Sequence, residues 1–183
     1  YATTIMFSTP TFLKNVLRAA EEGQLDTLRL VLTGAEKCPA TLFKQVAETL
    51  PHLTILEGYG ITECSPVVAM NTVEHNKRGS IGRLVRSLEH TIVSPEDETR
   101  LVPAGSPGML LLRGPSIMDG YLAFDGDSPF VTWDGRDWYK TGDLVTEDAD
   151  GFLTFSGRLK RFIKIGGEMI SLPAIESVLE EHY

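Results

Sequence analysis

The sequence predicts an α/β fold: a doubly wound, mostly parallel sheet, then a small β-rich, barrel-like unit, then the start of an α+β domain. Over residues 1–77, short apolar runs alternate with segments whose apolar residues recur every three or four positions, as in strands connected by helices. Over residues 78–156 this helical spacing disappears, and clusters of Gly, Pro, Asp and Ser separate the apolar runs, which favours strands joined by turns. Residues 157–183 are expected to contain a hinge and the first hairpin and helix of a further domain.

Composition limits the number of domains, the partners and the compartment that this protein can have. The chain has 183 residues, 42% of them hydrophobic, which suffices for one core or for a core with a small appendage. Its net charge of −8 argues against nucleic acid as the main partner. No apolar run approaches the roughly 20 residues that span a bilayer. The chain shows no signal peptide and begins with Tyr1, so we expect a piece of a longer, cytoplasmic protein.

The two cysteines support this compartment. Cys38 and Cys64 lie far apart in the sequence, and neither has another Cys or a His at a metal-binding spacing. We therefore expect reduced, buried and inert thiols.

The first predicted elements are a strand at residues 3–7 and a helix that follows it directly. Thr9 and Pro10 supply an N-cap and a first-turn proline, and the helix should continue to about Ala20. Its expected buried face consists of Phe12, Leu13, Val16, Leu17 and Ala20.

A second strand, at residues 28–33, ends at Gly34 and Ala35. The next helix should run from Pro39 to about Leu50, and further strands are expected at residues 53–56 and 65–71. The expected inner face of this helix consists of Leu42, Phe43, Val46 and Leu50.

The stretch from Glu57 to Glu63 follows the third strand and combines two glycines, a tyrosine, a hydroxyl and two carboxylates. Ligands of open α/β sheets lie beyond the carboxyl ends of the strands, where Gly58 would open onto the same edge as Gly34. Tyr59 offers a ring for stacking, Thr62 a hydroxyl for a phosphate, and Glu63 a carboxylate for magnesium. The alternative is a tight turn with polar surface residues.

The β-rich part should contain strands at residues 90–93, 108–113 and 151–155. Asp143 lies between its last strands, where it is either a turn residue or a carboxylate that accepts hydrogen bonds from a vicinal diol.

The last part of the chain suggests a hairpin over residues 157–170 that turns at Gly166 and Gly167, followed by a helix from Leu172. Its basic residues form either a nucleic-acid patch or, more commonly in an acidic chain, a solvated face. These basic residues are Arg158, Lys160, Arg161 and Lys164.

Taken together, the motifs resemble the core signatures of the AMP-forming adenylating enzymes: acyl-CoA synthetases, luciferases and peptide-synthetase adenylation domains. The signatures are Tyr59-Gly60-Ile61-Thr62-Glu63, Tyr139-Lys140-Thr141-Gly142-Asp143 and Gly157-Arg158-Leu159-Lys160 with Gly166-Gly167-Glu168, and lesser matches begin at Gly79 and Gly114. The order and spacing of these motifs extend the resemblance over essentially the whole chain.

The resemblance implies roles for individual residues. Tyr59 would stack on the adenine of ATP or AMP beside the backbone of Glu57 and Gly58, and Thr62 would contact the α-phosphate. Glu63 would bind Mg²⁺, which makes Thr62 and Glu63 the candidate catalytic residues.

For the rest of the site, the resemblance implies that Asp143 binds the ribose hydroxyls and that Arg158 meets the ribose or a phosphate. Lys160 would be the hinge about which a C-terminal domain rotates. Two pairs would border the acyl pocket or the acceptor channel: Gly34 with Ala35, and Gly166 with Gly167.

Within the family, residues 62–68 and 160–172 are most similar to bacterial acyl-carrier-protein synthetases of the 2-acylglycerophosphoethanolamine acyltransferase type. This likeness implies fatty acid and ATP as substrates, holo acyl carrier protein as the thiol acceptor, phospholipid acylation as the purpose, and a longer protein that could associate with the inner membrane. Long-chain acyl-CoA ligases share much of both segments, so coenzyme A remains an alternative acceptor.

The resemblance also places a phosphate-binding loop upstream of this chain and a catalytic lysine downstream of Tyr183. We therefore expect negligible adenylating activity from the isolated chain, to be checked by ATP–pyrophosphate exchange. Two alternatives remain: a non-catalytic module that binds AMP or a carrier protein, and a luciferase-like oxidoreductase, to which no feature of the sequence points.

Overall fold

The computed structural model describes residues 2–165, 168–172 and 175. The chain divides into two compact units, Tyr1–Val85 and Arg86–Tyr183, and each is described by itself. Within the described residues, no helix has the length and apolar character needed to cross a membrane.

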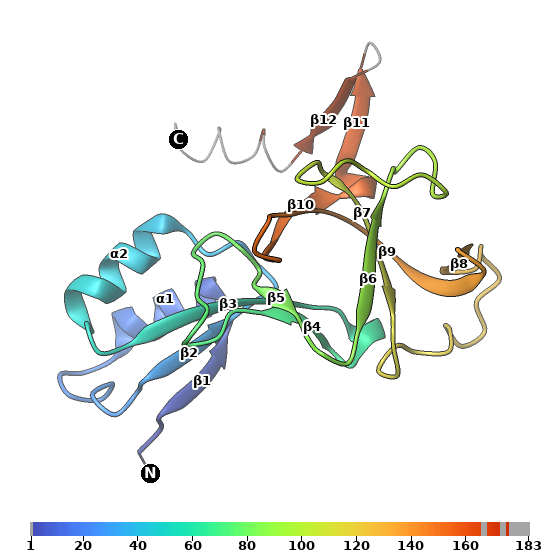
Figure 1. The fold of residues 1–183 in the computed structure, drawn as a ribbon. Helices are drawn as coiled ribbons and strands as arrows, with labels where there is room; N and C mark the ends of the chain where they lie inside the picture. Colours follow the sequence, from blue (N-terminus) through green and yellow to red (C-terminus); the bar gives the residue numbers. More distant parts are fainter. Residues whose placement is uncertain (1, 166–167, 173–174, 176–183) are drawn as a thin grey trace. The chain divides into compact units, whose positions relative to one another are not determined.

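The first unit is built on a five-stranded sheet with the strand order β1-β2-β3-β4-β5 (Figure 1). The strands are β1 (Ile5–Ser8), β2 (Leu30–Thr33), β3 (Thr54–Gly60), β4 (Val67–Met70) and β5 (Arg83–Leu84). The first three strands pair in parallel, whereas β4 and β5 are antiparallel to their neighbours.

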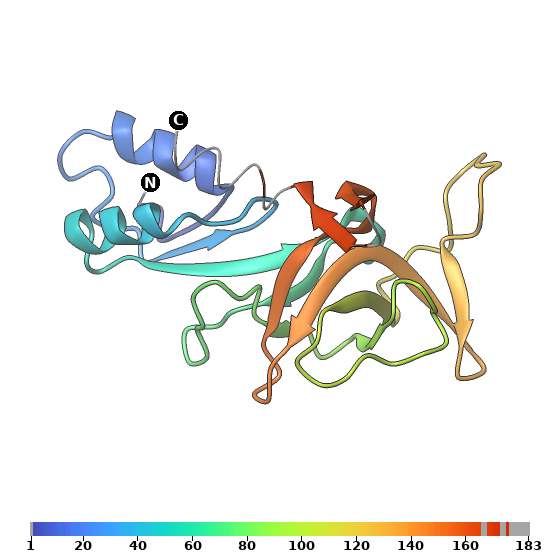
Figure 2. The ribbon, with the colours of Figure 1, turned by 90° about the horizontal axis from the view of Figure 1, so that it is seen from above.

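Two helices, α1 (Pro10–Ala19) and α2 (Ala40–Thr49), cover one face of the parallel strands (Figures 1 and 2). This follows from strand order, because two right-handed crossovers that advance in the same direction place both helices on the same side. One cluster joins them: Leu13 of α1, Leu42 and Val46 of α2, and Val31 and Ile55 of the sheet.

The predicted cap of α1 is confirmed, since the Thr9 hydroxyl accepts a hydrogen bond from the Phe12 N–H at 3.2 Å. The prediction that Phe12 is buried is wrong, because its side chain is 58% exposed. Successive helical residues are about 100° apart, so Phe12 lies beside the stripe through Leu13 rather than on it.

The third strand is longer than predicted. It does not end at Leu56 but continues to Gly60, because its pairing partner changes along its length. Up to Glu57 it pairs with β2, and from Gly58 it pairs with β4. The stretch that was expected to follow a strand therefore lies largely inside one, and only the short 3-10 turn η1 (Thr62–Cys64) comes after it.

The second unit contains an antiparallel sheet with the order β10-β9-β7-β6, to which β8 adds at β9. Its strands are β6 (Glu89–Val93), β7 (Gly108–Arg113), β8 (Phe130–Trp133), β9 (Arg136–Glu147) and β10 (Leu153–Arg158). The sheet bends into a half-barrel, with β9 as its long curved strand (Figure 2). Val93, Met109, Leu111, Trp138 and Leu144 form a buried core on it.

The chain then passes through the short turn η2 (Leu159–Arg161) into an antiparallel pair of strands, β11 (Phe162–Ile165) and β12 (Glu168–Ser171). The predicted hairpin is thus present, although it begins at Phe162 and not at Gly157, which belongs to β10. Its turn residues, Gly166 and Gly167, lie outside the described residues. Of the predicted final helix, Leu172 and Ile175 are described, and both are helical.

Candidate functional site

Gly34, at the carboxyl end of β2, lies close to Gly58 as predicted, although Gly58 is inside β3 and not at its end. A Cβ atom placed on Gly34 would lie 3.1 Å from the carbonyl oxygen of Gly58, a tight contact even for side-chain carbon. Ala35 follows in a left-handed conformation with φ of 67°, which turns the chain away from the sheet. Of the first predicted pocket pair, the structure therefore brings Gly34 beside Gly58, with Ala35 next to it in the chain.

A sharp turn follows β3 and presents Thr62 to solvent. Gly60 is required there, because a Cβ atom would lie 2.5 Å from the carbonyl oxygen of Pro66. The Ile61 N–H donates to the same carbonyl at 2.8 Å, and Ser65 closes the turn in a left-handed conformation. Thr62 is exposed and Glu63 half-buried, so a hydroxyl and a carboxylate follow each other on a tight turn.

The carboxylate of Glu57 is half-buried and accepts a hydrogen bond from the Gly79 N–H at 2.7 Å. Burial raises the pKa of this carboxyl, while the Gly79 N–H and the charge of Lys37 act in the opposite direction. Burial likewise raises the pKa of the Cys38 thiol to about 11, and the charge of Glu57 adds to that shift.

A residue that the sequence analysis did not single out, Asn71, is fully buried directly after β4. Its side-chain amide donates to the carbonyl oxygens of Glu57, at 2.9 Å, and Ser80, at 3.0 Å. Its side-chain oxygen accepts from the Lys77 N–H at 2.8 Å. The sequence signal was weak, since one asparagine at the end of a strand usually indicates only a turn.

In the second unit, the prediction that Asp143 lies between strands is wrong, because it lies inside β9, which excludes the turn interpretation. Gly142, with φ of 70°, creates a bulge: β9 uses the four steps from Lys140 to Leu144 where β7 uses only the two from Met109 to Leu111. Asp143 is 1% exposed, and its Oδ1 lies 3.2 Å from Nε of Arg158, its cross-strand partner on β10. The structure thus brings the two predicted ribose-binding residues together.

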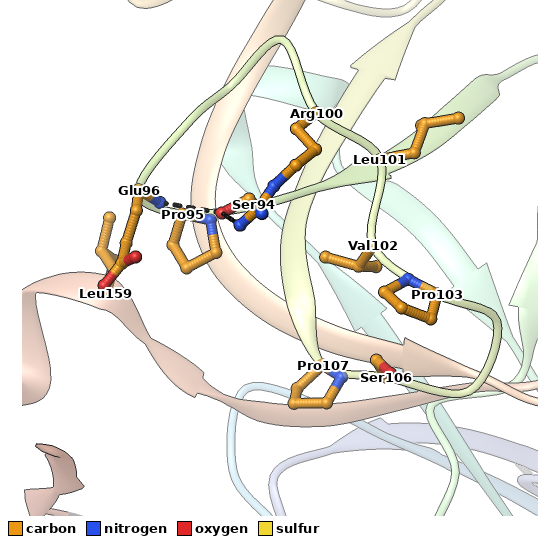
Figure 3. A pocket seen from close by; sticks show the side chains of 10 residues that line it. All are labelled: Ser94, Pro95, Glu96, Arg100, Leu101, Val102, Pro103, Ser106, Pro107 and Leu159. Atoms are coloured by element: carbon orange, nitrogen blue, oxygen red, sulfur yellow. Dashed lines mark hydrogen bonds between the residues drawn. The ribbon is translucent and has the colours of Figure 1, made fainter.

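Lys160 lies exposed in η2, and the residue before it anchors that turn. Leu159 packs against the buried core of the half-barrel and also lines a cavity of about 610 Å³ (Figure 3). The other walls of this cavity come from residues 94–107, where the Arg100 guanidinium approaches the hydroxyl of Ser94 at 3.4 Å. Of the residues predicted to bind substrate, none that the structure describes lines this cavity.

Within the described part of the chain, no group of three or more His, Cys, Asp or Glu side chains is arranged to hold a metal ion. Glu63 alone would offer a carboxylate, which suits Mg²⁺ when phosphate oxygens and water complete the coordination shell.

The model of the AMP-binding enzyme family matches residues 1–122, which is more than half of the chain. The chain belongs to the AMP-binding enzyme family. That membership covers all of the first unit and extends into the second.

Among its relatives, the chain is 37% identical over 189 residues to 4-coumarate–CoA ligase-like 3 of Oryza sativa subsp. japonica, covering 100% of this chain and 31% of the relative. It is 34% identical over 186 residues to a long-chain-fatty-acid–CoA ligase of Escherichia coli O6:H1, covering 100% of this chain and 32% of that enzyme. The chain therefore spans about a third of the length of these relatives.

The fold is shared with a solved structure of this family. O-succinylbenzoate coenzyme A synthetase from Bacillus subtilis, in complex with ATP and magnesium ion, superposes with a TM-score of 0.80 at 27% identity, covering 99% of this chain and 37% of that protein. This likeness confirms the mixed α/β architecture and the half-barrel sheet.

Proposed function

We propose that the full-length protein is an AMP-forming acid–thiol ligase that activates a fatty acid with ATP and transfers the acyl group to a thiol. The observation that carries this proposal is the tight turn after β3, in a chain of the AMP-binding enzyme family. It presents the Thr62 hydroxyl and the Glu63 carboxylate just after a strand that carries Tyr59.

In the first half-reaction, a carboxylate oxygen of the substrate attacks the α-phosphorus of ATP, the bond to the bridging oxygen breaks, and pyrophosphate leaves. Tyr59 would stack on adenine against the backbone of Glu57 and Gly58, and the Thr62 hydroxyl would donate to an α-phosphate oxygen. Mg²⁺, held by Glu63, would supply charge that offsets the negative charge gathering on pyrophosphate.

Asp143 and Arg158 would hold the ribose. A carboxylate accepts both hydroxyl hydrogens of a vicinal diol, and the Arg158 guanidinium forms an ion pair with the Asp143 carboxylate, with Nε 3.2 Å from Oδ1. Because Arg158 is itself 60% exposed, it retains hydrogen-bonding capacity for the nucleotide.

In the second half-reaction, the acceptor thiolate attacks the acyl carbonyl, and AMP leaves as the thioester forms. A change of conformation between the two steps would centre on Lys160, with Leu159 fixing the start of the hinge to the half-barrel core. Gly166 and Gly167 would border the acceptor channel.

Two acceptors compete. Acyl carrier protein is favoured by the exposed basic side chains of Arg158, Lys160 and Arg161, because acidic carriers associate faster with a cationic surface. Coenzyme A is favoured by the relatives named above, which are CoA ligases.

We place the reaction in the cytoplasm. With carrier protein as the acceptor, we further propose that phospholipid acylation at the inner membrane consumes the acyl group.

The deciding experiment offers the full-length protein a long-chain fatty acid and ATP with Mg²⁺, and supplies either coenzyme A or holo acyl carrier protein. Thioester formed only on the carrier protein supports the carrier-protein ligase, and thioester on coenzyme A assigns an acyl-CoA ligase. Failure to form either thioester or AMP overturns the ligase proposal and leaves the non-catalytic AMP-binding module.

A further inference from the structure

Asn71 connects three segments that meet behind the proposed adenine-binding backbone. Its backbone N–H and its side-chain amide both donate to the carbonyl oxygen of Glu57, each at 2.9 Å. The same amide also donates to the Ser80 carbonyl, and the side-chain oxygen accepts from the Lys77 N–H. The Glu57 carbonyl belongs to the peptide bond that leads into Gly58, so this residue fixes that peptide plane from behind.

The loop that Asn71 holds also contacts Glu57 from its other side. Gly79 donates its N–H to the Glu57 carboxylate, and Ser80, only 2% exposed, donates its hydroxyl to the Lys77 carbonyl at 2.7 Å. Glu57 is therefore held at both its carbonyl and its carboxylate by residues 71–80. Glu57 is the last residue of β3 that pairs with β2, and Gly58 is the first that pairs with β4.

We propose that Asn71 is a positioning residue for nucleotide binding, which fixes the Glu57–Gly58 peptide in the orientation that receives adenine. The inference rests on the proposed function and adds to it a determinant that does not itself touch the nucleotide. An apolar residue at position 71 would remove the side-chain partner of the Ser80 carbonyl and of the Lys77 N–H, and would leave the Glu57 carbonyl with the backbone N–H of residue 71 but without the side-chain amide, which holds the Glu57–Gly58 peptide less firmly.

Asn76 provides a matched control in the same loop. Its side-chain amide donates to the carbonyl oxygen of Ile55 at 3.1 Å, two residues earlier on β3 and away from the peptide in question. Asn76→Ala thus removes a loop-to-strand hydrogen bond without touching Glu57. Asn71→Asp is a third variant: it keeps the acceptor for Lys77 but loses both side-chain donations, of which protonation of its carboxyl restores one.

The test measures AMP affinity of the full-length protein by calorimetry, together with thermal unfolding. We expect Asn71→Ala to weaken AMP binding about tenfold or more and Asn76→Ala to leave it within about twofold. The affinity of Asn71→Asp, relative to wild type at the same pH, should recover as acid protonates the buried carboxyl and restores one donor, whereas Asn71→Ala should show no such recovery.

The outcomes separate the two proposals. The positioning role is overturned if wild-type protein binds AMP and Asn71→Ala binds it equally well. It is also overturned if Asn71→Ala and Asn76→Ala weaken AMP binding alike. In both cases the ligase proposal stands. The absence of pH-dependent recovery in Asn71→Asp also counts against the positioning role. If wild-type protein binds no AMP and forms no thioester, the proposed function fails, and the positioning role fails with it.

Discussion

Cys38 and Cys64 are both buried, with 7% and 1% of their surfaces exposed. Burial raises the pKa of each thiol from 9.0 to about 11, with the nearby carboxylates of Glu57 and Glu63 adding to the respective shifts. At pH 8 the folded protein should therefore contain about a hundredfold less thiolate than the unfolded chain, and its reaction with a disulfide reagent should be slower by a similar factor.

The same shifts predict how stability depends on pH. Unfolded thiols lose their protons near pH 9, whereas the folded thiols keep theirs to about pH 11, so deprotonation stabilises the unfolded state in between. The free energy of unfolding should be unaffected by these groups below pH 9 and fall between pH 9 and 11, by roughly 2–3 kcal/mol per thiol.

Urea unfolding between pH 9 and 11 measures this fall in the free energy of unfolding. The Cys38→Ala, Cys64→Ala double variant should be less stable at pH 7, because it loses buried side-chain volume, but should show a shallower decline above pH 9. An equally steep decline in the double variant would assign the loss to other groups.

The loop between β4 and β5 contains two glycines that differ in the space around the position of a Cβ atom. Gly79 and Gly82 both have positive φ, 79° and 85°. A Cβ atom on Gly79 would meet nothing within 4 Å, whereas one on Gly82 would lie 1.9 Å from the backbone carbon of Met70. We expect Gly79→Ala to cost about 1 kcal/mol of stability from the left-handed backbone alone.

Gly82→Ala should cost more than about 3 kcal/mol, because backbone in contact with backbone cannot move aside as a flexible side chain does. Denaturant unfolding of both variants measures the difference. Equal losses would mean that the close approach of this loop to β4 is not maintained in solution.

Elements whose signals are local were predictable, and those that depend on a distant partner were not. Thr9 and Pro10 specify the start of α1 by themselves, and the cap forms as expected. The continuation of β3 through Tyr59 was not predictable, because it requires β4 to fold back and pair with it. The glycines that indicated a turn are needed in this strand because neighbouring backbone lies too close for a larger residue, at Ala69 for Gly58 and at Pro66 for Gly60.

In the candidate site, too, features set by neighbouring residues were predictable, and features that depend on a distant partner were not. The closeness of Thr62 and Glu63 was predictable because they are neighbours in the sequence, and their roles stay predictions. The pairing of Asp143 with Arg158 joins two strands in register, and the bulge at Gly142 that orients Asp143 is visible only once β7 is paired with β9. Asn71 escaped prediction because its importance lies in its burial and its partners, and the sequence around it carries no motif.

For the molecule as a whole, the distribution of charge matters more than its sum. The chain carries a net charge of −8, yet Arg158, Lys160 and Arg161 are basic and exposed within four consecutive positions. An acidic carrier protein would be repelled by the net charge at long range and attracted by this segment at short range. Association through it should therefore weaken as salt screens the contact.

Charge reversal at Arg161 tests this docking role directly. Arg86→Glu serves as the control, because Arg86 is also exposed and its reversal changes the net charge by the same amount outside the basic segment. We expect Arg161→Glu to raise the KM for holo acyl carrier protein about three- to tenfold at low salt, with kcat changed little, since rim charges act mainly on encounter. Arg86→Glu should leave that KM within twofold, and the gap between the two variants should narrow at 0.5 M salt, where the Debye length is only about 4 Å.

Equal KM values for the two variants would contradict this prediction. They would mean that only net charge matters and that the carrier protein docks elsewhere. Equal values would also remove the structural support for a carrier protein over coenzyme A as the acceptor.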